Sequence, residues 1–302
     1  MIRSLAGLLV VVVVCLCHPG KKAQDPPPRH HEDRRITRAL LVDPRTRMSL
    51  EQSAMRVSPW QIGVRQLPQL VGRHRFNQGA EDDTGVNHGK VVGAQVVDSD
   101  RGRAMEFDGS NYVRIRHPQS IDITGPLTLA AWVKLSPKTR CNRNGENGQA
   151  YLVTKGRLCG SGVYRLMAST AQCPWGPKTF SFNIKTSDGE PYGHSVSATP
   201  ESGNAFDDSW HHVAGTFDGT FLKLYIDGVL KKVNRIKGNV KIISRKCDMA
   251  IGGWGPTRYR MMRGLIDDVR IYNSSLSRHE IRMMAAIPAF SGPTLAENHP
   301  RI

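Results

Sequence analysis

The chain has 302 residues, 39% hydrophobic and 23% charged, a composition typical of one or two folded domains. It excludes a collagen, a polar disordered chain and a membrane protein with several spans. The formal net charge is +16. The excess is spread out, because residues 18–73 hold 11 basic and 5 acidic side chains and residues 74–302 hold 30 and 21. Such a surface favours polyanions in general, without the single basic stripe that would indicate a specific nucleic-acid partner.

Residues 1–17 are predicted to be a signal peptide. Arg3 precedes an apolar run, 5–17, that is shorter than the roughly 20 residues of a spanning helix but has the length and flanks of a secretory segment. An uncleaved anchor and a bacterial lipoprotein remain open alternatives, although the residues before the two cysteines of this run are larger than a lipoprotein signal requires. We therefore expect a secreted or cell-envelope-associated protein, with no transmembrane span in the mature chain.

Export gives meaning to the remaining cysteines, which are Cys141, Cys159, Cys173 and Cys247. An even number outside the cytosol predicts two disulfides, in one of three pairings that the sequence leaves open. The absence of a C-x-x-C spacing argues against the alternative of a zinc site. Four unpaired thiols would require that the chain stay inside the cell.

The chain then divides into a tail and a domain. Residues 18–66 contain a Pro-Pro-Pro run, scattered arginines and few aromatics, and are predicted to be a mostly disordered tail or linker. Residues 67–287 are predicted to form the folded domain, and residues 288–302 a C-terminal tail. Within the domain, short alternating runs indicate half-buried strands. The alternating runs are 112–116 and 180–184. The longer apolar run 127–135 and the runs 210–217, 221–226 and 265–272 are predicted to be strands as well.

Turn signals connect several of these strands. Asp218-Gly219 and Asp227-Gly228 tolerate the positive φ angles of tight hairpins, so residues 210 onward are predicted to form a three-stranded meander. Ser277 and Glu280 form a capping box, which predicts one short C-terminal helix. Many strands with a single helix indicate an all-β sandwich.

Four stretches in order resemble a known family. They are RAMEFDG with YVxI (103–115), LTLAAWVK (127–134), WHHVAGTFDG with LxLYIDG (210–228) and GLIDDVRIYNxxLSxxEI (264–281). Together they resemble the LamG-like (laminin G type 3) domain of the concanavalin A-like lectin/glucanase superfamily, over roughly residues 73–285. The resemblance implies a jelly roll of two antiparallel sheets, in a module typical of extracellular proteins and used for binding rather than catalysis.

Two tryptophans, Trp132 and Trp210, are predicted to be core residues of their strands. His211 and His212 are adjacent and therefore face opposite sides, so they are not expected to hold one metal together. Enzyme activity is not expected, because a glycosidase of this superfamily needs two carboxylates on one strand face. The consecutive Asp267 and Asp268 are predicted to face opposite sides.

A structural calcium ion is a candidate cofactor. The acidic, glycine-turned loop at 82–89 offers oxygen ligands of the kind calcium takes. In domains similar to this one, such a loop can meet the aspartate of the last strand, which here points to Asp83 and Asp267, with Asp82 or Asp268 as further candidates. The alternative is that the loop aspartates are turn residues. Asp108, Asp218 and Asp227 are interpreted as turn formers before glycine.

Ligand contact is predicted at an aromatic and basic loop, 254–260. Trp254 and Tyr259 would stack on a sugar ring while Arg258 holds an acidic group. A loop aromatic that anchors the core is the alternative. We therefore predict a secreted carbohydrate-binding module that recognises a glycan or a glycosylated, anionic surface. The alternatives are an adhesive protein-interaction module without a sugar site and, more weakly, a glycan hydrolase.

Overall fold

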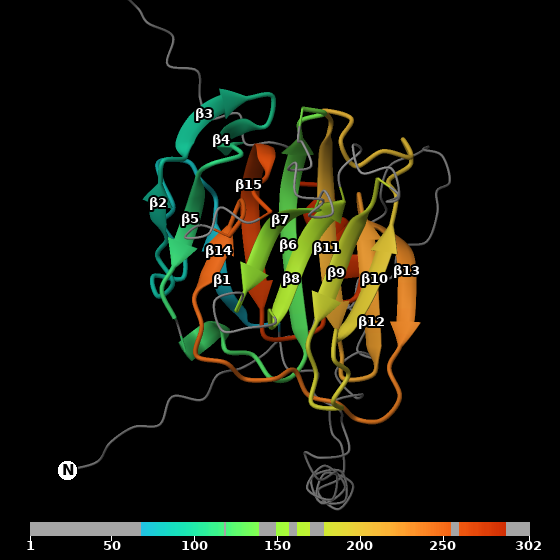
Figure 1. Ribbon diagram of the computed structural model, residues 1–302. Helices are drawn as coiled ribbons and strands as arrows, with labels where there is room; N and C mark the ends of the chain where they lie inside the picture. Colours follow the sequence, from blue (N-terminus) through green and yellow to red (C-terminus); the bar gives the residue numbers. More distant parts are fainter. Residues whose placement is uncertain are drawn as a thin grey trace, which may run out of the picture. The chain divides into compact units, whose positions relative to one another are not determined.

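The computed structural model describes residues 68–117, 119–138, 149–156, 162–169, 178–254 and 260–287, which all belong to the C-terminal unit of the chain, Gln66–Ile302. The predicted signal peptide and both predicted tails lie outside these residues. The described residues form two antiparallel sheets, one 3-10 helix and one α-helix (Figure 1). None of the described helices is long and apolar enough to cross a membrane.

Sheet A has eight strands in the order β13-β12-β11-β6-β15-β4-β3, with β1 paired to β15. Their bounds are β1 (Leu70–His74), β3 (Gln95–Ser99), β4 (Gly102–Asp108), β6 (Leu127–Leu135), β11 (Trp210–Phe217), β12 (Phe221–Ile226), β13 (Val229–Arg235) and β15 (Arg263–Tyr272). The meander expected from the Asp-Gly turns is confirmed as β11-β12-β13.

Sheet B has seven strands in the order β10-β9-β8-β7-β14-β5-β2. Their bounds are β2 (Lys90–Val92), β5 (Tyr112–Ile115), β7 (Gln149–Lys155), β8 (Tyr164–Ser169), β9 (Phe180–Ile184), β10 (His194–Ala198) and β14 (Met249–Ile251). The 3-10 helix η1 (Gln119–Ile121) joins β5 of sheet B to β6 of sheet A. The predicted jelly-roll sandwich of two antiparallel sheets is therefore confirmed.

The core lies between the two sheets and follows the period of two. Along β6 the odd-numbered residues from Leu127 to Leu135 are buried in it, and β8 and β9 contribute Leu166 and Phe182 from the other side. Gly215 lets the sheets approach here, because a Cβ on it would lie 2.1 Å from the Phe182 ring. A larger residue at 215 would push the sheets apart.

The helix α2 (Arg278–Ala285) begins at the predicted capping box. The Ser277 side chain accepts a hydrogen bond from the Glu280 backbone, and the Glu280 carboxylate accepts one from the Ser277 backbone N–H. Ile281 and Met284 pack against alanines of β6 and β11 that alternate with the core residues. The helix thus covers part of the outer face of sheet A.

Two predictions about strand faces are wrong. Trp132 is out of phase with Leu129 and Ala131, and lies half-buried on the outer face of sheet A rather than in the core. Trp210 is on the same face, because the residue opposite it is Lys134, two positions from Trp132. On the outer face, the aromatic rings pack against neighbouring polar side chains instead of core residues and are therefore only half-buried.

The second error concerns the acidic pair of β15. The register shifts between Asp267 and Arg270, and Asp268 has a φ of +46°. Ile266 and Val269 both enter the core, so the two aspartates between them lie together on the outer face. A β-bulge of this kind breaks the alternation on which the prediction relied.

Candidate functional site

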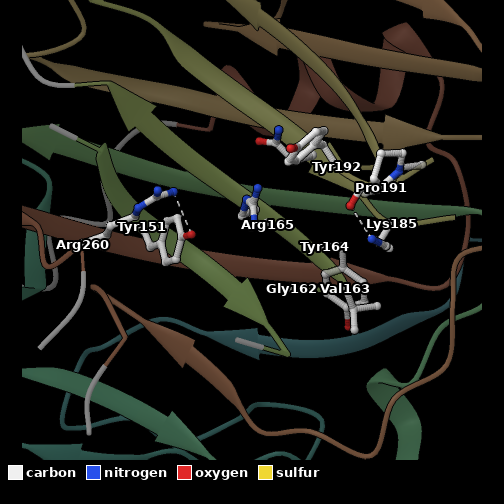
Figure 2. Close-up of a pocket in the computed structure, with 11 residues that line it drawn as sticks. Tyr151, Gly162, Val163, Tyr164, Arg165, Lys185, Pro191, Tyr192 and Arg260 are labelled. Atoms are coloured by element: carbon white, nitrogen blue, oxygen red, sulfur yellow. Dashed lines mark hydrogen bonds between the residues drawn. The ribbon is translucent and has the colours of Figure 1, made fainter. Parts of the chain in front are cut away.

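The outer face of sheet B opens into a cavity of about 320 Å³ (Figure 2). This volume is at the lower end of the roughly 300–1,000 Å³ typical of small-molecule sites. The pocket is formed by β7, β8, β9 and the β9–β10 loop together with Arg260. Its described lining residues are Tyr151, Gly162, Val163, Tyr164, Arg165, Asn183, Ile184, Lys185, Pro191, Tyr192 and Arg260.

The floor of the pocket follows from strand alternation in β8 and β9. Leu166 and Phe182 point into the core, so Arg165 and Asn183 point outward, and the two residues are directly opposite each other. The buried Oδ1 atom of Asn183 has no hydrogen-bond partner among the described residues. A buried acceptor without a partner is costly, so the floor offers a position for a ligand donor.

Tyr151 of β7 organises the basic side of the pocket. Its ring packs with Met167 and Trp254 in a small cluster on the outer face. Nη1 of Arg260 donates to the Tyr151 hydroxyl at 3.0 Å. The guanidinium carbons of Arg260 and Arg165 lie 5.3 Å and 5.5 Å from the centre of the same ring. Cation–π contact with one ring therefore orients both arginines.

The β9–β10 loop forms the opposite rim and presents Tyr192, which is 92% exposed. Nζ of Lys185 donates to the Pro191 carbonyl at 2.6 Å, and the side chains of His194 and Asp188 are 2.6 Å apart. Burial raises the pKa of Asp188, but hydrogen bonds from His194 and Thr186 outweigh it and hold that pKa below its usual range. Tyr192 therefore presents an exposed aromatic ring at this rim of the pocket.

None of the three predicted ligand residues is among the described residues that line this pocket. Trp254 is 2% exposed and packs under Tyr151, so it supports the wall and does not line the cavity. Arg258 and Tyr259 lie outside the described residues, so their role stays a prediction. Arg260, from the same loop, does line the pocket. The pocket residues on β7, β8 and β9 were missed, because single polar residues in short strands give no motif.

A second polar cluster lies on the outer face of sheet A. The Arg101 guanidinium sits 3.6 Å above the Trp132 ring, with its Nε 3.8 Å from Oδ2 of Asp267. The Asp268 carboxylate binds Arg73 at 2.7 Å and Arg270 at 2.5 Å. Here each charged side chain has an opposite charge beside it, and Arg101 covers the aromatic ring.

The two aspartates of this cluster have opposite pKa shifts. Burial, and then the neighbouring Asp268, raise the pKa of Asp267 to about 7. Burial also disfavours ionised Asp268, but the hydrogen bonds from Arg270 and Arg73 outweigh it and lower its pKa. Two carboxylates with divergent pKa values can serve as an acid–base pair. These two are held by arginines in the closed cluster.

The neighbouring histidines do face opposite sides, as predicted. His212 contacts the Trp132 ring on the outer face, and burial lowers its pKa to about 4. His211 contacts Phe180 of sheet B. Burial disfavours its charged form, but Asp227 and Asp207 outweigh burial and raise its pKa. Both rings serve as packing and hydrogen-bonding residues.

The predicted calcium ligands have arginine partners. Oδ2 of Asp83 is 2.7 Å from Nε of Arg75, whereas Asp267 faces Arg101. Asp82 organises its own loop by accepting hydrogen bonds from the backbone of Arg73 and of the loop itself. The described residues contain no group of three or more His, Cys, Asp or Glu side chains that could hold a metal. A shared calcium ion thus stays a prediction without geometric support.

The predicted disulfides fall mostly outside the described residues. Cys141, Cys159 and Cys173 lie there, so the pairing stays open. Cys247 is 3% exposed and forms a disulfide. Two residues before Cys247, the Arg245 carbonyl accepts a hydrogen bond from Nζ of buried Lys155 at 2.8 Å. The same Nζ donates to Asp122 at 2.5 Å.

Comparisons with known proteins agree with this architecture. Over 170 residues the chain is 27% identical to the adhesion G-protein coupled receptor V1 of Danio rerio; the match covers 55% of this chain and 2% of that receptor. Among solved structures, domain 4 of AbnA, a GH43 extracellular arabinanase from Geobacillus stearothermophilus in complex with arabinotriose, superposes with a TM-score of 0.52 at 18% identity, covering 72% of this chain and 98% of that one.

The ligand-binding domain of botulinum neurotoxin serotype D, in complex with N-acetylneuraminic acid, gives a TM-score of 0.54 at 15% identity, covering 72% of this chain and 50% of that one. At such identities the likeness establishes the fold alone. The family description itself, however, matches residues 107–282, which is more than half of the chain. The chain therefore belongs to the laminin G type 3 family of the concanavalin A-like lectin/glucanase superfamily.

Proposed function

We propose that this domain is an extracellular, non-catalytic module that binds carbohydrate in the pocket on the outer face of sheet B. The observation that carries the proposal is the pocket wall, in which Tyr151 holds two arginines and Tyr192 stands exposed on the rim. Sugar rings pack against aromatic rings, and arginine side chains donate to sugar oxygens. The similar domains bound to arabinotriose and N-acetylneuraminic acid add support at the level of the fold.

A binding role fits the pocket better than hydrolysis. Hydrolysis of a glycosidic bond uses two carboxylates that flank the bond. No Asp or Glu is among the described residues that line the pocket. The adjacent carboxylates Asp267 and Asp268 are on the other sheet and are bound by arginines.

Two of the similar proteins support an extracellular location for this domain. The matching curated relative is an adhesion receptor, and the arabinanase is described as extracellular. The predicted signal peptide and the disulfide at Cys247 point the same way. Expression of the full chain with a C-terminal tag, followed by N-terminal sequencing of the secreted form, tests this part of the proposal.

A glycan array tests binding directly. We expect the domain to bind a restricted set of glycans, and Tyr192→Ser to abolish binding while the melting temperature stays unchanged. Tyr112→Ser, on a strand of the same sheet but outside the pocket lining, serves as the control that keeps binding. Glycan binding that survives Tyr192→Ser would place the sugar elsewhere.

One observation favours a second candidate, adhesion to protein. The receptor relative is an adhesion receptor, and one similar toxin domain was solved in complex with rat synaptotagmin II. A domain that binds no glycan on the array but captures a cell-surface protein after enzymatic deglycosylation would support this candidate and exclude the sugar site.

A further inference from the structure

The sequence contains a single Asn-x-Ser/Thr tripeptide in which x is not proline, Asn273-Ser274-Ser275. Such a tripeptide is the acceptor for N-linked glycans in secreted proteins, where it lies in a surface loop. Because the same tripeptide also arises by chance, its place in the fold decides whether the site can be used.

The structure places this tripeptide in the bend that follows β15 and precedes α2. The Asn273 side chain is exposed, and Ser274 and Ser275 are half-buried. The backbone of the bend is held by buried Thr128, whose Oγ1 donates to the Ser274 carbonyl at 2.7 Å and accepts from the Leu276 N–H at 3.0 Å. The bend is thus fixed to sheet A while its asparagine faces solvent.

The amide of Asn273 can take a sugar without losing its contact in the fold. Its Nδ2 donates one hydrogen bond, to Oε1 of Gln69 at 2.7 Å, and a primary amide has two N–H groups. The second N–H can be replaced by a bond to a sugar carbon while the hydrogen bond to Gln69 is kept. Gln69 is itself exposed, so even the loss of this hydrogen bond would cost little.

We propose that Asn273 carries an N-linked glycan when the chain passes through a secretory pathway that performs this modification. The inference rests on the extracellular location proposed above. In the transfer, Nδ2 forms a bond to C1 of a lipid-linked oligosaccharide, the bond from C1 to the pyrophosphate oxygen breaks, and Nδ2 loses one proton to the host transferase. The lipid pyrophosphate is the leaving group, and no oxidant or reductant is needed.

The position of this glycan leaves the proposed sugar site open. Asn273 follows a strand of sheet A and precedes the helix that covers part of the outer face of that sheet. The pocket opens on the outer face of sheet B, and Asn273 is not among its described lining residues. The attached glycan and the ligand of the pocket therefore belong to opposite sheets of the sandwich.

Mass spectrometry of the secreted chain tests the proposal. The full chain is expressed in animal cells, which perform this modification, and its intact mass is compared before and after treatment with peptide-N-glycosidase. We expect a decrease by the mass of one glycan. The enzyme converts the asparagine that held the glycan to aspartate, so treatment in heavy-oxygen water should label the tryptic peptide 271–278 at Asn273.

Substitutions within the tripeptide locate the modification. Asn273→Gln and Ser275→Ala should each remove the glycan, because the first removes the acceptor amide and the second removes the hydroxyl that the tripeptide requires. Ser274→Ala keeps the tripeptide and should keep the glycan. The buried Oγ of Ser274 has no hydrogen-bond partner among the described residues, so this control should be well folded. Ser275→Thr should also keep the glycan, which separates the loss of the hydroxyl from any change of folding at this position.

The outcomes distinguish this inference from the proposed function. A secreted wild-type chain whose mass does not change on treatment overturns the glycan and leaves the extracellular location in place. A glycan that persists in Asn273→Gln, or that is lost in Ser274→Ala, also overturns the inference. A chain that stays in the cytosol overturns the extracellular location and the glycan together.

Discussion

The outer faces of the two sheets carry similar residue types but arrange them differently. On sheet A, arginines meet aspartates, with Asp268 between Arg73 and Arg270 and Arg101 above Trp132 and near Asp267. On sheet B, arginines meet a tyrosine ring at the edge of a cavity whose described lining has no acidic residue.

The difference is informative about function. A cluster whose charges are balanced from within stabilises the fold and offers little to a ligand, because a ligand would have to break existing pairs. The cavity on sheet B has no acidic residue in its described lining and presents the exposed ring of Tyr192 to a ligand. We propose that the arginine–aromatic contact, which stabilises structure on sheet A, lines a binding site on sheet B.

The largest effect is expected for Asp268→Asn. Asparagine accepts the positive φ of this bulge position but removes the charge that faces Arg73 and Arg270, both of which are largely covered. Loss of one partner from such a cluster costs about 3–5 kcal/mol, which should appear as a clear drop in the midpoint of denaturant unfolding. A midpoint equal to that of the wild type would mean that the cluster is not structural.

A bound calcium ion would contradict this comparison, because the charges of the sheet A cluster would then not be balanced by its own side chains alone. If Asp83 and Asp267 share one, stability rises by about 2.7 kcal/mol at a hundredfold excess of free calcium over Kd. Asp267→Asn should remove this gain and Asp227→Asn should retain it. Melting in chelator and in millimolar calcium measures the response. Identical wild-type curves would leave the arginines as the counterions of both carboxylates.

Asp267 should make stability depend on pH. Its pKa of about 7 in the folded state lies above the ordinary value of 3.8, so the folded protein binds more protons than the unfolded chain between these values. Stability from this group is therefore greatest at low pH and is lost as the pH rises to 7 and above. We expect Asp267→Asn to match the wild type near pH 5 and to exceed it at pH 8 by about 3 kcal/mol.

Unfolding of both proteins at the two pH values checks this prediction. His211 also titrates in the folded state, but it is unchanged in the variant, so the difference between the two curves isolates Asp267. A parallel pH dependence in the two proteins would show that Asp267 has an ordinary pKa.

The smallest effect on stability is expected on sheet B. Tyr192 is 92% exposed, so Tyr192→Ser should change the free energy of unfolding by no more than about 0.5 kcal/mol. Its effect should appear in ligand binding alone, in contrast to Asp268→Asn. A large loss of stability in Tyr192→Ser would show that the β9–β10 loop is part of the structural framework rather than a rim for ligand.

The sequence by itself determined the elements that depend on local chemistry. A long apolar run predicted β6, and runs on either side of an Asp-Gly turn predicted β11 and β12, all with the bounds that the structure has. Asp227-Gly228 predicted the next hairpin through its positive φ angles, and Ser277 with Glu280 predicted the start of α2. These signals lie within a few residues of each other, so no distant contact is needed to read them.

Only the tertiary structure decided which residues meet. A period of two separates the faces of a strand but does not say which face is buried, and on β6 the face without Trp132 is the one that enters the core. The bulge after Ile266 reverses the alternation with no change of composition. The pocket unites Tyr151, Arg165, Tyr192 and Arg260 from four segments of chain. Their meeting depends on sheet order and cross-strand register, which are set by contacts between residues far apart in the sequence.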